Sequence, residues 1–441
     1  MLVIMLALAM LAACSSNSGN GSSSGNSGAT SGTGGSAGSD NAAGSSEKGK
    51  PTKAELRIAL QLPQFESQFR AFYDKFKAKM LEEENIDVDI IPDFIPSENA
   101  TQVLQTRLIS STPPDIFSFH AYIETELYKR AGYLEDLSGQ PFIDNLNDDV
   151  RGIMFEIGDG HMYSVPLDLI YWGYLYNVDI FDQYNLKAPQ TITELRNVID
   201  TLKANNVTPF SLAYGETHPA QSLMIASMAP YLSNLPDFYE RMSAGEGSFT
   251  EVADMFEVID LVNSSGNDRM FEYGVNEIMP VFANGDTAMW VMGPWFAEPL
   301  RQTNPDFNFR VAPFPVSDNP EDTALIMGLG QSFGVNTKSK NKELALKFIN
   351  FVLDEKESSS LYESIGTYPL AKVHNYETGV WYKDLAQYTG NGQVVRDLDI
   401  PRAVRNEGGS MMQGYAAGSV TKEDLLGAMD RAWAEFNRAT Q

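Results

Sequence analysis

The sequence is poor in the residues that metal sites and nucleophilic enzymes use. Its 441 residues include one cysteine, Cys14, and four histidines: His120, His161, His218 and His374. A single thiol cannot form a disulfide within the chain. No two histidines stand three or four residues apart, so no helix carries a pair of metal ligands. We therefore expect no metal and no cofactor.

Familiar catalytic and nucleotide-binding motifs are missing as well. The chain has no Gly-x-Ser-x-Gly and no Gly-x-x-x-x-Gly-Lys-Ser/Thr. The glycines of "GLGQSFG" (328–334) have the wrong spacing for a dinucleotide loop, and "DNPED" (318–322) lacks the central Gly and distal Glu of a calcium loop. A pair of carboxylates for glycoside hydrolysis stays open, because sequence spacing does not fix their separation in space.

Positive charge is also scarce. There are 32 Lys and Arg residues against 58 Asp and Glu, which gives a formal net charge of -26. Such an acidic surface repels phosphate, so we exclude nucleic acid as a partner and expect no adsorption to anionic lipid by charge alone. The hydrophobic share of 43% is that of a globular protein, and 441 residues exceed one ordinary core, which predicts two domains.

A long apolar run occurs at the start of the chain. The thirteen residues before Cys14 in "MLVIMLALAMLAACSS" are too few to span a bilayer but suit an export signal. Leu11-Ala12-Ala13-Cys14 resembles the lipobox of bacterial lipoproteins, in which a peptidase cuts before the cysteine and the thiol is acylated. The resemblance implies a signal peptide over 1–13 and a lipid on Cys14. No Lys or Arg precedes the run, and an ordinary signal peptide with a chance cysteine is the alternative.

A low-complexity segment follows the cysteine. From Ser15 to about Ser46 the chain is almost wholly Ser, Gly, Asn, Ala and Thr, which cannot bury apolar surface. We expect residues 14–52 to form a lipidated, disordered linker with an end-to-end distance of roughly 35 Å. Lipid and linker would tether the protein to the extracellular face of the cell membrane, or place it in the periplasm if the host has an outer membrane.

Beyond the linker, strand-like and helix-like patterns alternate. "KAELRIALQL", "IDVDIIP" and "PPDIFSF" predict strands, while "FESQFRAFYDKFKAKM" and "SENATQVLQTRLISS" predict the helices between them. This order predicts a parallel sheet with crossover helices. Further helical regions are expected at 342–365 and at 421–439, where Thr421 is the N-cap.

Five stretches, taken in order, resemble one protein family over almost the whole chain after the linker. They are similar to blocks of the sugar-type (family 1) extracellular solute-binding proteins of bacterial ABC importers. Asp168 lies nine residues before Asn177, two more than in the maltose-binding members, so the alignment of that carboxylate departs from the family pattern. The stretches are "PPDIFSFHA" (113–121), "GHMYSVPLDLIYWGYLYNVDIFDQYNLKAPQTITEL" (160–195), "FANGDTAMWVMGPWF" (282–296), "FGVNTKSKNKELALKFINFVL" (333–353) and "SIGTYPL" (364–370).

The resemblance implies a two-lobe, periplasmic-binding-protein-like (type II) α/β fold with hinge strands between the lobes. Ligands of such folds are held at the carboxyl ends of sheet strands and enclosed by hinge closure. The first lobe would comprise 53–166 and 315–363, and the second 167–314 and 364–441. It also implies a monomeric binding protein, not an enzyme, that captures a carbohydrate and delivers it to ABC permease subunits.

The expected ligand contacts follow from the chemistry of sugars, which present apolar C–H faces and a rim of hydroxyls. Trp295, after Gly293-Pro294, falls on the family's stacking tryptophan, whereas Trp290 is expected in the core. His120 ends a strand that delivers polar ligands. The remaining candidates, from the matching blocks and from loops at the expected cleft, are Asp168, Trp172, Glu66, Gln64, Tyr368, Tyr214, Glu216, His218 and Gln331. Arg405 and Gln413, in a stretch that reads as a polar loop, receive no role.

Three alternatives remain open from the sequence. The same fold binds other solutes, and this acidic chain could supply carboxylates for a polyamine, while the tyrosines of "LIYWGYLYN" could suit iron; a phosphate ester is a further possibility. A surface-anchored glycan hydrolase is the second alternative. The third is a receptor that signals and does not transport.

Overall fold

The computed structural model describes residues 49–96, 100–353 and 357–440. The predicted signal peptide, Cys14 and most of the predicted linker lie outside these residues. In the described part of the chain, no helix combines the length and the hydropathy that crossing a membrane requires.

The first sheet gathers strands from distant parts of the sequence. Its order is β2-β1-β3-β11-β4, with β1 parallel to β2 and β3, and β11 antiparallel to β3 and β4. The predicted strand-helix-strand order is confirmed, although β1 already begins at Thr52, inside the expected linker. The elements are β1 (Thr52–Leu60), α1 (Glu66–Glu84), β2 (Ile86–Phe94), α2 (Ala100–Leu108), β3 (Ile116–His120), β4 (Val165–Pro166) and β11 (Gln331–Val335).

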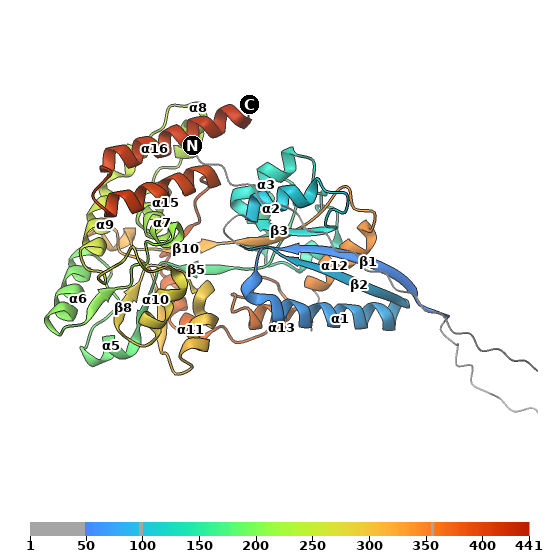
Figure 1. Ribbon diagram of the computed structural model, residues 1–441, viewed down its shortest axis with the longest axis horizontal. Coiled ribbons are helices and arrows are strands. Elements are labelled where there is room, and N and C mark those ends of the chain that lie inside the picture. Colours follow the sequence, from blue (N-terminus) through green and yellow to red (C-terminus); the bar gives the residue numbers. More distant parts are fainter. Residues whose placement is uncertain (1–48, 97–99, 354–356, 441) are drawn as a thin grey trace, which may run out of the picture. The chain divides into compact units, whose positions relative to one another are not determined.

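Helices cover both faces of this sheet (Figure 1). On one face, the helical spacing of Phe69, Phe72 and Phe76 in α1 presents one aromatic stripe, and Phe72 stacks on Phe351 with ring centroids 4.8 Å apart. On the other face, Phe117 packs with residues of α2 and α3. We call these two clusters together the first core. Its further helices are α3 (Ala121–Arg130), α4 (Asp148–Ile157), α12 (Lys342–Val352) and α13 (Glu357–Ser364).

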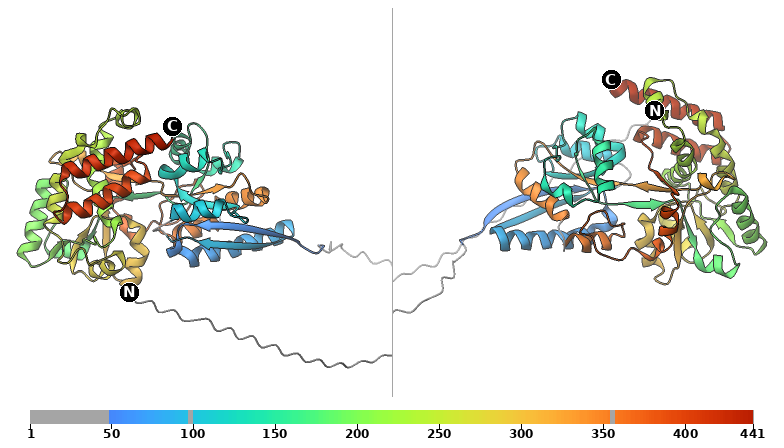
Figure 2. Two further views of the ribbon diagram at one scale, coloured as in Figure 1. Left: turned by 45° about the horizontal axis from the view of Figure 1, so that its top comes forward. Right: turned by 180° about the vertical axis from the view of Figure 1, so that it is seen from behind.

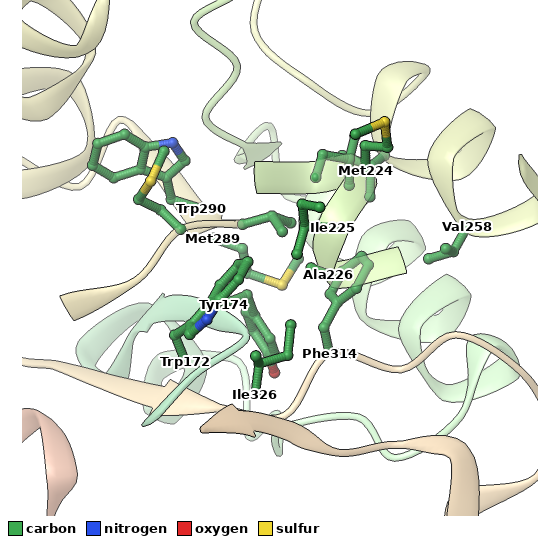
Figure 3. Close-up of a cluster of buried hydrophobic side chains, with 14 of the residues drawn as sticks. Trp172, Tyr174, Met224, Ile225, Ala226, Val258, Met289, Trp290, Phe314 and Ile326 are labelled. Carbon is green, nitrogen blue, oxygen red and sulfur yellow. The ribbon is translucent and has the colours of Figure 1, made fainter. Parts of the chain in front are cut away.

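The second core surrounds a four-stranded sheet of order β7-β8-β6-β9. Trp290 in β8 is 1% exposed and lies beside Met289 in this core (Figure 3), so its predicted place in the core is confirmed. The elements are β6 (Tyr174–Asn177), α5 (Val178–Gln183), α6 (Ile192–Ala204), β7 (Thr208–Phe210), α7 (Thr217–Ser233), α8 (Phe238–Ala244), α9 (Phe256–Asn263), α10 (Val275–Ala283), β8 (Thr287–Trp290), α11 (Ala297–Thr303), β9 (Phe309–Ala312) and α14 (Leu385–Gly390).

Two helices at the end of the chain, α15 (Arg402–Ala416) and α16 (Lys422–Thr440), pack side by side on the second core (Figure 2). The expectation of a polar loop in this region was wrong. A Cβ at Gly408 would stand 2.6 Å from the sulfur of Met224 in α7, so the glycines that suggest a loop serve close helix packing. The predicted Thr421 cap is confirmed, because its hydroxyl accepts a hydrogen bond from the Asp424 amide.

A third sheet, of order β12-β10-β5, lies where the chain passes between the cores (Figure 1). It contains β5 (Ile170–Trp172), β10 (Leu325–Gly328) and β12 (Val394–Arg396), with β10 antiparallel to β5. Leu325 and Ile326 still pack in the second core, whereas Leu329 packs in the first. The β10–β11 segment therefore passes from the second core to the first near 326–329. The lobe bounds expected from the sequence stay a prediction. That the cores move as separate lobes stays a prediction.

Short 3-10 helices complete the described elements. They lie at Pro63–Phe65, Pro141–Asn145, Phe249–Met255, Pro294–Phe296, Pro320–Asp322 and Val380–Tyr382.

Candidate functional site

Trp295 stands directly after the break that ends β8. Its side chain is partly exposed, and its ring meets the ring of Trp172 edge to face, with centroids 5.5 Å apart. A Cβ at Gly293 would lie 1.8 Å from the Trp295 ring, so the ring lies across the glycine backbone in a position that a larger residue would block. The indole Nε1 of Trp295 is buried without a hydrogen-bond partner among the described residues.

Two predicted contacts flank this ring. Trp172 is 5% exposed and packs in the second core (Figure 3). It therefore supports the Trp295 ring and offers little surface of its own. His218, in the first turn of α7, is exposed, and its ring centroid lies 5.9 Å from that of Trp295. Although one side of His218 is open to solvent, the protein around it desolvates the ring and lowers its pKa to about 4. The imidazole is therefore neutral at pH 7.

In the first core, His120 and Gln331 are opposite each other across β3 and β11. Both side chains are partly exposed, yet His120 Nδ1 and Gln331 Oε1 are buried and have no partner within the described chain. Burial lowers the pKa of His120 well below its usual value, and the charges of Arg405 and Arg402 lower it further. Buried polar atoms normally find a partner, so these two atoms mark a place where a polar ligand would be stabilised.

Asp168 connects two of the segments that cross between the cores. Its Oδ1 accepts hydrogen bonds from the amides of Gly330, at 2.5 Å, and Gln331, at 3.2 Å. Burial raises the pKa of its carboxyl to about 6, against the opposing effect of these two amides. Asp168 therefore joins the β4–β5 segment to the β10–β11 segment beside Gln331.

Two other predicted contacts of the second core already have partners. Tyr214 is 2% exposed, and its hydroxyl donates to Asn263 Oδ1 at 2.7 Å. The Glu216 carboxylate accepts from the Val275 amide at 3.1 Å, at the start of α10. Both side chains therefore have structural partners, and their contact with a ligand stays a prediction.

The remaining predicted contacts, Gln64, Glu66 and Tyr368, differ in their exposure and in their own partners. Gln64 is exposed, and Glu66 forms an ion pair with Arg70 at 2.6 Å. The Tyr368 amide donates to the Leu169 carbonyl at 2.9 Å, and its ring packs edge to face on Tyr171, with centroids 5.3 Å apart. Tyr368 therefore packs at the crossing segments, as a hinge residue would.

Two ion pairs beside His120 were missed from the sequence. Arg402 binds Glu124 at 3.1 Å, and Arg405 binds Asp397 at 3.1 Å. Arg405 is 6% exposed and also donates to the Ile400 carbonyl. Sequence spacing could not reveal these contacts, because each unites segments that only the fold brings together.

The two arginines next to the candidate site are paired with carboxylates within the protein. Each arginine has a carboxylate partner, both histidines are held neutral, and Asp168 accepts two amide hydrogen bonds. Among the described residues, no group of three or more His, Cys, Asp or Glu side chains could hold a metal ion. What the site offers is an aromatic ring, neutral hydrogen-bonding atoms and the Asp168 carboxylate.

Comparison with known proteins agrees with this chemistry. The sequence model of the family described as "Bacterial extracellular solute-binding protein" matches residues 63–358. The "Multiple sugar-binding protein" of Streptococcus mutans is 24% identical over 299 residues, which are 66% of this chain and 70% of that protein. The "Melibiose/raffinose/stachyose-binding protein" of Bacillus subtilis is 18% identical over 408 residues, 90% of this chain and 94% of that protein.

A solved structure has the same architecture. The crystal structure of a sugar transporter from Bacillus licheniformis, in complex with stachyose, matches with a TM-score of 0.71 and 20% identity, and covers 88% of this chain and 100% of that chain. This likeness confirms the predicted two-lobe α/β fold.

Proposed function

The chain belongs to the family of bacterial extracellular solute-binding proteins, and we propose that it captures an oligosaccharide where its two cores meet and delivers it to an ABC permease. Relatives that are named for binding several sugars support the carbohydrate assignment. The fold supports capture between two lobes that close on the ligand.

One observation carries the proposal most directly. Unpartnered buried polar atoms are present on both cores: His120 Nδ1 and Gln331 Oε1 on the first, and Trp295 Nε1 and Arg402 Nε on the second. An indole ring with neutral donors and acceptors around it is what a sugar needs, because its C–H faces stack on the ring and its hydroxyls exchange hydrogen bonds. A ligand that contacts both sets would satisfy these atoms and hold the lobes together.

The same chemistry favours a neutral ligand over the charged alternatives. A polyamine would require several carboxylates without other partners, but Glu124, Asp397 and Glu66 each pair with an arginine, and Asp168 and Glu216 accept hydrogen bonds from backbone amides. A phosphate ester would need a cation without a carboxylate partner, and Arg402 and Arg405 each have one, although Arg402 Nε has no hydrogen-bond partner within the described chain. Iron held by carboxylates and imidazoles would need three or more such side chains together, and the described residues contain no such group. Ligation by tyrosines is tested by ferric citrate in the panel below.

A thermal-shift panel tests the proposal. Raffinose, stachyose and maltooligosaccharides form one arm, and spermidine, ferric citrate and glycerol 3-phosphate form the other. A neutral sugar at a hundred times its Kd should stabilise the fold by about 2.7 kcal/mol and raise the Tm by a few degrees. A shift produced only by the amine, the metal or the phosphate would overturn the carbohydrate assignment.

We propose no covalent chemistry for this site, in keeping with the family and its named relatives, which are binding proteins. The alternative of a glycan hydrolase has its own test. Shortened products after incubation with oligosaccharides, abolished by one carboxylate substitution, would contradict the binding role.

We further propose that the protein works as a monomer anchored through a lipid on Cys14. The lipobox-like sequence supports this placement on the extracellular face of the membrane, and the Ser/Gly segment supports free reach toward a permease.

A further inference from the structure

Glu124 is the most deeply buried carboxylate next to the candidate site. Its side chain is 1% exposed and has partners from three segments. Its Oε1 accepts from the Thr101 hydroxyl of α2 at 2.5 Å, and its Oε2 accepts from the His120 amide at 2.9 Å. The third partner is the guanidinium of Arg402, at 3.1 Å from Oε2. Glu124 therefore fixes the residue whose ring carries one of the unpartnered atoms.

The pair of Glu124 and Arg402 connects the two cores. Glu124 lies on α3, whose Tyr128 packs in the first core, and Arg402 begins α15, whose Val404 and Met412 pack in the second (Figure 1). If the cores moved apart, Glu124 would keep a hydroxyl and an amide but lose the guanidinium, its one cationic partner within the described part of the chain. A buried carboxylate without a cation is strongly disfavoured.

A second ion pair joins the first core to the third sheet, whose strand β12 packs against the second core. Arg396 of β12 binds Glu156 of α4, and the two side chains are 53% and 66% exposed. Exposed pairs contribute little, because water and salt screen them. The buried pair and the exposed pair therefore serve as test and control.

We infer that the Glu124–Arg402 pair is a latch that favours the arrangement in which the two cores meet, and that Glu124 is a positioning residue for ligand binding through His120. The predicted effect on affinity rests on the proposed function, because it assumes a ligand that contacts both lobes and so binds best to the arrangement that the pair favours. The predicted effect on the distance between the cores does not. By mass action, any loss of the binding-competent population lowers the apparent affinity by the same factor.

The test compares Glu124→Gln and Arg402→Gln with the control Arg396→Gln. Cysteines are introduced by Gln105→Cys in α2 and Glu423→Cys in α16, at two exposed positions, in a Cys14→Ser background. Spin labels on these cysteines report the distance between the cores. Without ligand, both latch variants should shift the distance distribution toward longer separations, and the control should match the parent. With the sugar identified by thermal shift, the latch variants should bind about tenfold more weakly, and the control should stay within about twofold.

Two further variants separate a latch from a general packing defect. Arg402→Lys keeps the positive charge and should restore part of the affinity that Arg402→Gln loses. The double variant Glu124→Gln with Arg402→Gln should bind no more weakly than the worse single variant, because both remove one interaction. If Glu124→Gln fails to fold, Arg402→Gln carries the test, since Arg402 is 34% exposed.

Unchanged distances and affinity in both latch variants would overturn the inference, as would losses that add in the double variant. The distance measurement needs no ligand, so it tests the latch even if no sugar in the panel binds. Failure of the panel would count against the proposed function alone.

Discussion

The ring of Trp295 lies across the backbone of Gly293, so closely that a Cβ on the glycine would meet ring carbon Cζ3 at 1.8 Å. Pro294 between them opens a 3-10 turn, Pro294–Phe296, that carries the ring back over the chain. The backbone of Gly293 has a φ of -95°, which any residue can adopt. Space for the ring, and not backbone strain, is therefore what glycine provides at this position.

Removing the ring should weaken sugar binding with little effect on the fold. Trp295→Ala deletes a partly exposed side chain, and we expect a loss of about 1–3 kcal/mol in binding, as one well-placed aromatic usually contributes. Calorimetric titration measures the affinity and urea denaturation the stability. The matched control is Trp290→Ala, which removes a ring 1% exposed and should cost about 3–5 kcal/mol of stability. Normal affinity with a large loss of stability in Trp295→Ala would contradict its role.

Displacing the ring without deleting it should have a similar effect on binding. Gly293→Ala places a methyl group where the Trp295 ring lies, so the ring must move. We expect a fall in affinity of at least about 1 kcal/mol, together with a change in tryptophan fluorescence. Gly152→Ala, in α4, is the control, because a Cβ there meets nothing within 4 Å. Parent-like affinity in Gly293→Ala would show that the position of the ring is unimportant for the ligand.

Asp168 should make the stability depend on pH in an unusual direction. Its folded pKa, about 6, exceeds that of an aspartate in an unfolded chain, so between about pH 4 and 6 the folded state holds a proton that the unfolded state has released. Stability attributable to this group therefore falls as the pH rises through that window, by at most about 3 kcal/mol. Asp168→Asn should remove the dependence, measured as the difference from the parent in urea unfolding at pH 4 and pH 7.

An exposed aspartate provides a control of opposite sign. Asp318 accepts hydrogen bonds from the amide and hydroxyl of Thr193, which lower its pKa. Its contribution is present above its unfolded pKa and is lost as the pH falls, so Asp318→Asn should differ from the parent more at pH 7 than at pH 3. A pH dependence of the same sign for both aspartates would contradict the assignment for Asp168.

Membrane attachment should depend on the single thiol of the chain. Cys14→Ser removes the expected acylation site, and the protein should then be recovered from the medium or periplasm and not from the membrane fraction. Metabolic labelling with a fatty acid, followed by fractionation, measures both effects. Labelling that persists in Cys14→Ser would contradict the lipoprotein assignment.

The strands and helices were predicted well where the pattern of apolar residues is local. The alternation in β1 and the aromatic stripe of α1 each come from residues a few positions apart. In the structure these residues lie on the buried face of the strand and of the helix. The helix α15 was missed because Gly408 and Gly409 suggest a loop. In the structure they allow α15 to pack closely against α7, since a Cβ at either position would meet α7 side chains. Packing between elements distant in sequence overrides local preference there.

In the candidate site, too, features set by neighbouring residues were predicted and features set by distant residues were not. The Gly-Pro-Trp sequence predicted that Trp295 would project from the end of a strand, and the structure places its ring beside Trp172 and His218. The bond of Asp168 to the Gly330 amide and the pairing of Glu124 with Arg402 depend on three-dimensional proximity. No spacing in the sequence contains that information. The ligand contacts themselves stay predictions.

The most direct test of the account is amide hydrogen exchange with and without the sugar found by thermal shift. We predict slower exchange on both cores at once: at the end of Ile116–His120, around Gln331, and in Pro294–Phe296. Protection confined to one core would contradict capture between two lobes. So would protection confined to the open groove between α1 and α13 that Ser67, Lys75 and Ser364 line.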